Sequence, residues 1–403
     1  MGNKNYDIII VGASIAGATA AMLYAKEGFN VLVIDKKDVN SHKKSCTHFI
    51  QPSALHIISR LDIQKEIEDN GGIRSTADFW YGKDWIRGSV IKDSSVYAYN
   101  IERRILDPIL KQKMLGYKSI TFLQNTNVTK VLFENDIPIG ISSDQQNTVV
   151  NYYSDIIIAA DGKYSTIAKL INAKEEKFAN DRVTFFGYYN NAKLKSGTVS
   201  QFWSLGENMA FAYPLQNDTV LLSAYICREQ MDEWLINSEE KMYSLFSVLP
   251  DGPMLANSKL RDSVHRMLNI ESIRRPAEYI NIPFIGDAAL ALDPMSGVGC
   301  GFAFQSASWL VEHTVKGLKA GNKQELYTGI KEYAAYHTKM LNSHAKGIFA
   351  DSKVSKNEKE EVFDFIKDSQ VLSEYFIKLI YRLIQPEKFQ LEFIKTKKTL
   401  IEK

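Results

Sequence analysis

A glycine-rich turn close to the N-terminus constrains the fold of this chain more than any other feature. The apolar run at residues 8–11 is typical of a buried parallel strand. It leads into a turn with Gly12, Ser14 and Gly17, after which the small residues at 18–26 predict a helix. In such a strand–turn–helix unit, the backbone N–H groups at the helix N-terminus are placed to bind a pyrophosphate.

A second apolar strand completes the unit. Residues 31–34 end on Asp35, about 18 residues after Gly17, which is close to the ~20 typical of an acid that binds a ribose hydroxyl. Ser14 replaces the middle glycine of the pattern, and glycine-rich turns also occur without nucleotides. The order of the elements nevertheless predicts a dinucleotide site, with contacts from Gly12, Ser14, Ile15, Ala16, Gly17, Asp35 and Lys36.

Composition excludes several classes of protein. The net charge of +2 is spread along the chain without an arginine stripe, so we expect no nucleic-acid partner. Cys46, Cys227 and Cys300 are too scattered for a disulfide framework or a zinc site, which favours a reducing compartment and no bound metal. The N-terminus enters a core strand directly, and no apolar run approaches the ~20 residues that span a bilayer. We therefore expect a cytoplasmic protein.

Two further strands end on acidic residues. The apolar residues 156–159 run into Asp161 and Gly162, and the apolar stretch 279–285 runs into Gly286 and Asp287. Because parallel strands of an open α/β sheet present their carboxyl ends at one edge, these acids can converge with Gly12. Asp161 has an alternative role as a helix N-cap, with Ser165 as a polar surface residue.

Between these pieces, residues 183–273 alternate in polarity and are rich in aromatic residues, as in an antiparallel sheet. The nucleotide-binding part is therefore discontinuous, which argues against a simple NAD dehydrogenase. We expect a cofactor domain of residues 1–75, 100–180 and 275–320, a β-sheet substrate domain of 76–99 and 181–274, and a helical C-terminal region, 321–403.

Together, the three motifs make residues 6–320 similar to the FAD-dependent monooxygenases of the aromatic-hydroxylase type, with their geranylgeranyl-reductase-like and flavin-halogenase relatives. The resemblance implies an α/β fold with a discontinuous Rossmann FAD-binding domain of the glutathione-reductase type. It also implies an inserted antiparallel β-sheet substrate domain and a helical C-terminus. FAD is the cofactor that it implies, with Asp161, Gly162, Gly286 and Asp287 near the pyrophosphate and ribityl chain.

The resemblance implies further FAD contacts. Arg103 resembles an arginine that reaches the phosphates, although Arg104 competes for this role, and Val128 resembles a position that holds the adenine. Downstream of Asp293, the run with Gly299, Cys300 and Gly301 precedes a helix, so its N–H groups would stabilise negative charge on the reduced flavin ring. This run is closer to the Asp-Pro-x-Ser-Gly-x-Gly pattern of the reductase branch than to that of the hydroxylases.

The sequence identifies no definite catalytic residue, and the candidates are Cys46, His48 and Tyr213. Reductase relatives carry a cysteine near the flavin at the position of Cys46, but a thiol is also commonly a small buried hydrophobe. His48 suits substrate contact or proton transfer, or a structural role. Trp203, Phe211 and Tyr213 are expected either to line a substrate pocket or to pack the sheet core.

The activity that the resemblance implies is hydroxylation of a small aromatic or apolar substrate through a flavin C4a-hydroperoxide, with NAD(P)H as electron donor or an external reductase as partner. Two alternatives stay open, namely a geranylgeranyl-reductase-like enzyme that reduces an isoprenoid double bond and a non-catalytic FAD-binding protein. No paired-tryptophan motif of the halogenases is present. The apolar stripe at residues 376–383 predicts packing on its own domain or weak membrane contact through the C-terminal helices.

Overall fold

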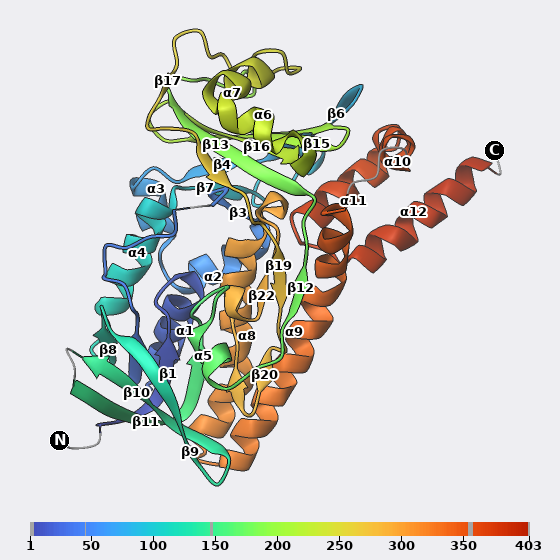
Figure 1. Ribbon diagram of the computed structural model, residues 1–403. Coiled ribbons are helices and arrows are strands. Elements are labelled where there is room, and N and C mark those ends of the chain that lie inside the picture. Colours follow the sequence, from blue (N-terminus) through green and yellow to red (C-terminus); the bar gives the residue numbers. More distant parts are fainter. Residues whose placement is uncertain (1–3, 45, 146–147, 354–357, 402–403) are drawn as a thin grey trace.

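The N-terminal strand–turn–helix–strand unit forms as the sequence predicts, at the centre of a six-stranded sheet. The computed structural model describes residues 4–44, 46–145, 148–353 and 358–401 (Figure 1). Strand β1 (Lys4–Val11) leads into helix α1 (Ile15–Lys26) and strand β2 (Val31–Ile34). The sheet order is β8–β2–β1–β11–β10–β9, with β8 (Ile120–Leu123), β9 (Asn127–Glu134), β10 (Ile137–Gln145) and β11 (Thr148–Ala159).

The parallel strands of this sheet end level with one another. Val11 pairs with Ile34 of β2 on one side and with Ala159 of β11 on the other. Strand β8 also ends level with β2, where Ile34 pairs with Leu123, and the segment of Phe284 reaches the same edge through a parallel bridge with Ala159. This register brings the residues that follow each strand, with the predicted acids among them, to a single edge of the sheet.

Close backbone contacts fix the first turn. Gly12 adopts a φ of +106°, and a Cβ added to it would lie 2.3 Å from the carbonyl oxygen of Ala160. A Cβ on Gly17 would lie 1.8 Å from the carbonyl oxygen of Gly12. Helix α1 can therefore approach the ends of β1 and β11 only because both positions lack a side chain.

A second, eight-stranded sheet lies at the top of Figure 1, and helices α8 and α9 lie below it beside the first sheet. Its order is β17–β13–β16–β15–β14–β5–β6, with β18 also paired to β13. The strands are β5 (Ala77–Tyr81), β6 (Asp84–Ile86), β13 (Arg182–Asn190), β14 (Ser200–Leu205), β15 (Asn208–Leu215), β16 (Thr219–Cys227), β17 (Lys259–Leu260) and β18 (His265–Met267). Most of its neighbouring strands run antiparallel, as predicted, whereas β5 and β14 run parallel.

Both faces of the eight-stranded sheet are covered. Alternate residues of β14 and β15 belong to two apolar clusters, with Phe202 and Tyr213 in one and Trp203 in the other. Helices α6 (Met231–Ile236) and α7 (Ser238–Ser247) contribute Trp234 and Phe246 to the cluster of Trp203. The aromatic side chains of this sheet therefore form core, which was one of the two roles that the sequence left open.

The remaining elements are short connections and long helices. One three-stranded sheet consists of β3 (Phe49–Ile50), β7 (Ala98–Asn100) and β4 (Ile73–Ser75). Another consists of β12 (Glu176–Phe178), β19 (Ser272–Arg274) and β22 (Leu290–Ala291). Strand β20 (Glu278–Tyr279) pairs with β21 (Ile282–Pro283). The other helices are α2 (Leu55–Arg60), α3 (Gln64–Asp69), α4 (Arg103–Leu115), α5 (Thr166–Leu170), α8 (Gly299–Lys319), α9 (Lys323–Asp351), α10 (Glu358–Lys367), α11 (Gln370–Ile380) and α12 (Pro386–Ile401).

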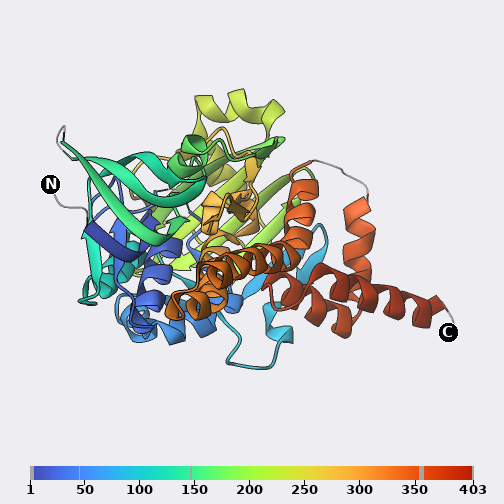
Figure 2. The same cartoon turned by 90° about the horizontal axis from the view of Figure 1, so that it is seen from below.

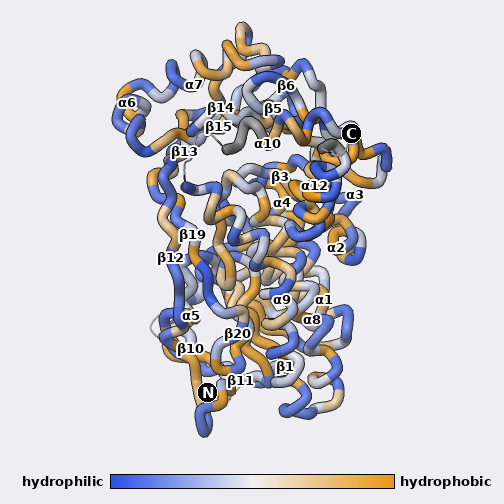
Figure 3. Tube along the Cα trace, turned by 90° about the vertical axis from the view of Figure 1, so that its right-hand side faces the viewer, coloured by the Kyte–Doolittle hydropathy of each residue, from blue (hydrophilic) through white to orange (hydrophobic). Residues whose placement is uncertain are grey.

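The helical C-terminus packs onto the rest of the chain before it projects outward. Phe376 of α11 lies edge-on to Phe79 of β5, with 5.3 Å between the ring centroids, while α12 extends away from the body (Figure 2). In Figure 3 the hydrophobic segments run through β1, β11 and α8, and many outer turns are hydrophilic. Within the described residues, no helix combines the length and the apolar character that crossing a bilayer would require.

The glycine contact in the first turn gives a stability prediction with a matched control. Gly17→Ala should lower the free energy of unfolding by more than ~3 kcal/mol, because the new methyl group meets backbone that cannot retreat. Gly347 also lies inside a helix, but a Cβ there meets nothing within 4 Å, so Gly347→Ala should stabilise the protein by ~0.5–1 kcal/mol. Urea unfolding of both variants measures these effects, and equal, small effects would contradict the predicted role of the contact.

Acid sensitivity has a local source in helix α9. Burial lowers the pKa of His337 to about 4, so the folded protein favours its neutral ring. Stability is then fully present above the unfolded pKa of ~6.5 and is lost as pH falls from there towards 4, by up to roughly 3 kcal/mol. His337→Leu should remove this loss. Unfolding curves of the two proteins between pH 7 and 4.5 check it, and parallel pH profiles would contradict it.

Candidate cofactor site

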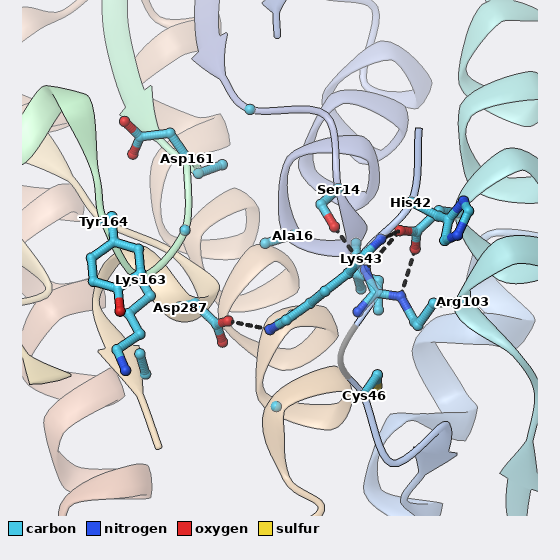
Figure 4. A pocket seen from close by; sticks show the side chains of 18 of the residues that line it. Ser14, Ala16, His42, Lys43, Cys46, Arg103, Asp161, Lys163, Tyr164 and Asp287 are labelled. Carbon is cyan, nitrogen blue, oxygen red and sulfur yellow. Dashed lines mark hydrogen bonds and ion pairs between the residues drawn. The ribbon is translucent and has the colours of Figure 1, made fainter. Parts of the chain in front are cut away.

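A cavity of about 720 Å³ opens at the edge where β1, β2 and β11 end (Figure 4). Its size lies within the range of ligand sites in proteins. Most of the predicted cofactor-binding residues line it. They are Gly12, Ser14, Ile15, Ala16, Asp35, Lys36, Arg103, Val128, Asp161, Gly162, Asp287, Gly299 and Cys300.

Three predicted cofactor-binding residues lie outside the lining, and each has a packing role. Gly17 faces the carbonyl oxygen of Gly12, as described above. A Cβ on Gly286 would meet Ala16, and its N–H donates to Ser306 Oγ at 2.9 Å. Gly301 faces Gln51 and Ser53 on the other side of α8. These glycines let the chain segments around the cavity approach one another, and they do not form its surface.

Asp35 organises the first turn from the end of β2. Its Oδ2 accepts the N–H of Ala13 at 2.7 Å, and its Oδ1 accepts the N–H of Lys37 at 2.8 Å. The carboxylate therefore holds two loops together at the cavity wall. Each oxygen keeps a second lone pair, so the residue can still accept a hydrogen bond from a ligand hydroxyl.

Asp161 serves as a helix cap and also carries an unused acceptor. Its Oδ2 accepts the N–H groups of Thr166 and Ile167 at 2.6 and 3.0 Å, at the start of α5. Ser165 is buried and accepts from Ala168 at 2.9 Å, so it caps the same helix and is not a surface residue. The Oδ1 atom of Asp161 is buried and has no hydrogen-bond partner among the described residues. Burial raises the pKa of Asp161.

Helices α1 and α8 both begin at the cavity without a side-chain cap. Helix α1 begins after Ser14 and helix α8 after Val298, and neither of these residues caps its helix with a side-chain hydrogen bond. The first-turn N–H groups, which carry the positive end of the helix dipole, therefore remain available for an anion. With the unpartnered Asp161 oxygen, the cavity offers donors for phosphate and an acceptor for a hydroxyl, and this set of groups fits FAD.

Arg103 is the arginine that lies at the cavity. It is buried on α4, where its Nε and Nη2 bind Asp107 at 2.6 and 3.0 Å, and Nη2 also donates to Ser14 Oγ at 2.8 Å. Its competitor Arg104 points away and pairs with Glu102 at 2.8 Å, with about half of its side chain exposed. The geometry thus separates two arginines that the sequence left in competition.

A basic loop contributes groups that the sequence analysis did not single out. Residues 36–44 form a strap along the cavity, and the Nζ of Lys43 crosses the opening to Asp287, 2.7 Å away (Figure 4). The charge of Asp287 raises the pKa of Lys43. Lys111 anchors the strap through three contacts of its Nζ, with Asp38 O at 3.0 Å, Ser41 O at 2.6 Å and Ser41 Oγ at 2.8 Å. The concentration of lysines in this loop was the only sequence signal for its role.

Two of the three catalytic candidates lie away from the cavity surface. The Nδ1 of His48 accepts the N–H of Arg103 at 3.0 Å, so the ring proton is on Nε2, which faces Tyr188 Oη at 2.5 Å. Burial lowers the pKa of His48, in keeping with this neutral, structural role. Tyr213 is buried, with its ring centroid 6.0 Å from that of Phe49. Of the three candidates, only Cys46 lines the cavity.

Comparison with known proteins supports the cofactor. The chain matches the FAD binding domain family over residues 5–342. It is 24% identical to 6-hydroxynicotinate 3-monooxygenase from Pseudomonas fluorescens over 60% of this chain and 64% of that protein, which is less than two thirds of its length. It is also 22% identical to digeranylgeranylglycerophospholipid reductase from Methanococcus vannielii over 91% of this chain and 92% of the reductase.

The fold has counterparts among solved structures. That of p-nitrophenol 4-monooxygenase from Pseudomonas putida DLL-E4 superposes with a TM-score of 0.77, covers 95% of this chain and 99% of its own, and is 14% identical in sequence. At this identity the likeness concerns the fold alone. The family match, in contrast, extends over most of the sequence and includes the glycine turn, Asp161 and Asp287. The protein therefore belongs to the FAD binding domain family.

Proposed function

We propose that this protein is an FAD-dependent monooxygenase that hydroxylates a small aromatic or apolar substrate, with NADPH or NADH as electron donor. One observation carries the proposal. A single cavity extends from the β1–α1 turn past Asp161 and Asp287 to the N-terminus of α8, and the apolar side chains of Met267, Ile270, Leu292 and Pro294 are among those that line it. The cofactor and an apolar substrate therefore share one continuous site.

The residues of the cavity suit successive parts of FAD. The N-terminus of α1 and the guanidinium of Arg103 would hold the pyrophosphate, because both offer donors to an anion. Asp35 would accept from a ribose hydroxyl, and Val128 lies in the part of the wall that we assign to the adenine. The Oδ1 of Asp161, which lacks a partner among the described residues, would accept from a hydroxyl, directly or through water.

When bound, reduced FAD supplies the activation of molecular oxygen, which side chains do not provide. The N–H groups of Gly299 and Cys300 at the start of α8 would stabilise negative charge on the flavin ring. Met267, at the end of β18 in the eight-stranded sheet, and Ile270, just after it, would exclude water from the cavity. The protein's own part in the reaction is therefore to position the substrate and to provide a dry environment.

The relatives favour hydroxylation as the reaction class. The Pseudomonas fluorescens relative is named as a 3-monooxygenase of 6-hydroxynicotinate, that is, for oxygen insertion at a ring carbon of a small aromatic compound. We extend this class of substrate to the present chain, and not that particular compound.

Oxygen-dependent turnover tests the proposal. FAD-loaded protein should consume NADPH or NADH and oxygen faster when a phenol or quinolone substrate is added, and mass spectrometry should find a product 16 Da heavier than the substrate. Photochemically reduced protein, re-oxidised by air in the presence of substrate, controls for a missing external reductase. If the reduced flavin re-oxidises without forming a product from any of the phenols and quinolones tested, the proposal is contradicted and a non-catalytic FAD-binding protein is favoured.

Reduction of an isoprenoid double bond is the second candidate. It is favoured by the match to a reductase over nearly the full length of both chains and by the position of Cys46 in the cavity wall. Under anaerobic conditions, reduced protein with an isoprenoid lipid should then give a product 2 Da heavier. A hydroxylase needs oxygen and the reductase does not. Assays of the phenols, quinolones and isoprenoid lipids with and without oxygen therefore distinguish the two functions.

Arg103 allows stability and cofactor binding to be separated. Arg103→Met leaves the buried Asp107 without its cation, which should cost about 3–5 kcal/mol of stability. The double variant Arg103→Met/Asp107→Leu should recover most of this loss and still bind FAD at least ~10-fold more weakly. Arg104→Met is the control and should change stability by less than ~1 kcal/mol, because Glu102 keeps Arg261 at 3.0 Å.

Thermal unfolding and FAD titration by fluorescence check both parts. A double variant that folds and binds FAD as tightly as the unmodified protein would show that Arg103 does not contact the cofactor.

A further inference from the structure

Two cysteines that lie far apart in the sequence meet at the wall of the cofactor cavity. The Sγ atoms of Cys46 and Cys300 are 3.8 Å apart, and both residues line the cavity. Cys46 lies just after the strap and just before β3, whereas Cys300 lies in the first turn of α8. A disulfide needs ~2.05 Å between its sulfurs, so the two atoms would have to approach by about 1.8 Å. Cys46 lies on a loop, which makes a shift of this size local.

The surroundings favour a thiolate on Cys46. A hydrogen bond from the Cys300 thiol lowers the pKa of Cys46 well below its ordinary value, and the charges of Lys43 and Arg103 act in the same direction. The N–H of His48 also donates to Cys46 Sγ at 3.3 Å. For Cys300 the hydrogen bond that it donates to Cys46, followed by burial, raises the pKa well above its ordinary value. One sulfur is therefore the nucleophile, and the other remains a thiol beside it.

The third cysteine provides a contrast within the same chain. Cys227 is buried at the end of β16, and its Sγ lies 3.6 Å from the Glu207 carboxylate. Burial and the charge of Glu207 raise the pKa of Cys227 to about 11. The charge of Arg182 acts in the opposite direction but does not outweigh burial and Glu207, so the thiol form prevails and we expect Cys227 to be inert.

We propose that Cys46 and Cys300 form a redox-active pair that hydrogen peroxide converts into a disulfide across the wall of the cofactor cavity. The Cys46 thiolate attacks one peroxide oxygen and breaks the O–O bond, which gives a sulfenic acid and a hydroxide that takes up a proton. The Cys300 sulfur then attacks Cys46, and water leaves as the S–S bond forms. Two electrons pass from the sulfurs to the peroxide, and two waters are released in total.

The bond would fasten the strap to α8. On the N-terminal side of Cys46, the ion pair of Lys43 with Asp287 already holds the strap in place. On its C-terminal side, His48 is held by the N–H of Arg103, which donates to its Nδ1. A disulfide between the strap and α8 would restrain this wall of the cavity, and we expect it to slow the exchange of bound FAD. The cross-link itself does not depend on the monooxygenase activity proposed above.

Mass spectrometry tests the pair directly. Reduced protein treated with a small excess of hydrogen peroxide should lose 2 Da, and digestion without a reducing agent should yield one peptide pair that joins Cys46 to Cys300. Dithiothreitol should reverse the change. Cys227→Ser should behave like the unmodified protein, and Cys46→Ser should form no disulfide. Peroxide that leaves both thiols free to be alkylated, or that joins Cys227 to either of them, would overturn the proposal.

The order of reactivity gives a second measurement, which needs no disulfide. At pH 6.5, iodoacetamide should label Cys46 at least ~10-fold faster than Cys227, because the thiolate is the reacting form. Cys300→Ala removes the hydrogen-bond donor and should slow the labelling of Cys46 several-fold, with circular dichroism confirming the fold. Equal labelling rates of Cys46 and Cys227 would contradict the assigned nucleophile.

The effect on the cofactor is read from FAD release. After dilution, holoenzyme oxidised by peroxide should release FAD several-fold more slowly than the same sample treated with dithiothreitol, as followed by flavin fluorescence. In Cys46→Ser the two release rates should be equal. Equal release rates before and after reduction in the unmodified protein would show that the disulfide does not restrain the cavity.

Discussion

The contact between Gly17 and the carbonyl oxygen of Gly12 is the constraint on which the rest of the structure depends. A side chain at either position would push α1 away from the ends of β1 and β11. With the helix close, its N-terminus, Asp35 and Asp161 all open onto one cavity, and Gly286 brings the segment of Asp287 against Ala16 in the same way. The site is thus built from backbone proximity first, and its charged groups take their positions from it.

Charge then fixes the loops that the sheet alone would leave free. The strap is held by Lys111 at its middle, by Lys43 on Asp287 and by the N–H of Lys43 on Asp107. The buried pair of Arg103 and Asp107 therefore connects α4, the strap and Ser14. Pairs of this kind contribute little net stability because desolvation offsets their attraction. Their value here is that they set the position of the Arg103 guanidinium at the cavity wall.

The residues that follow parallel strands could be predicted from the sequence, because the end of a parallel strand fixes where the next residue lies. Gly12, Asp35 and Asp161 are of this kind. Helix phase was harder to predict: Gly299 and Cys300 line the cavity, whereas Gly301, about 100° further round α8, faces Gln51. The roles of Lys43 and Asp107 were missed because they depend on contacts between residues far apart in the sequence. Lys43 is 244 residues from Asp287 and 64 residues from Asp107, and no local pattern encodes such contacts.

His48 and Tyr213 show why catalytic candidates are hard to identify from a sequence: histidine and tyrosine serve in catalysis, but they also serve as buried, hydrogen-bonded or packed residues, as they do here. The aromatic faces of the eight-stranded sheet are closed, with Trp203 buried on one side and Tyr213 on the other. A substrate cannot lie among them without displacing the core. The apolar lining that remains in the cavity comes from two parts of the chain, with Met267 of β18 and Ile270 just after it lining the same space as Leu292 before α8. Under the proposed function, substrate selection would fall to these few side chains, so that a small number of substitutions there would change the specificity.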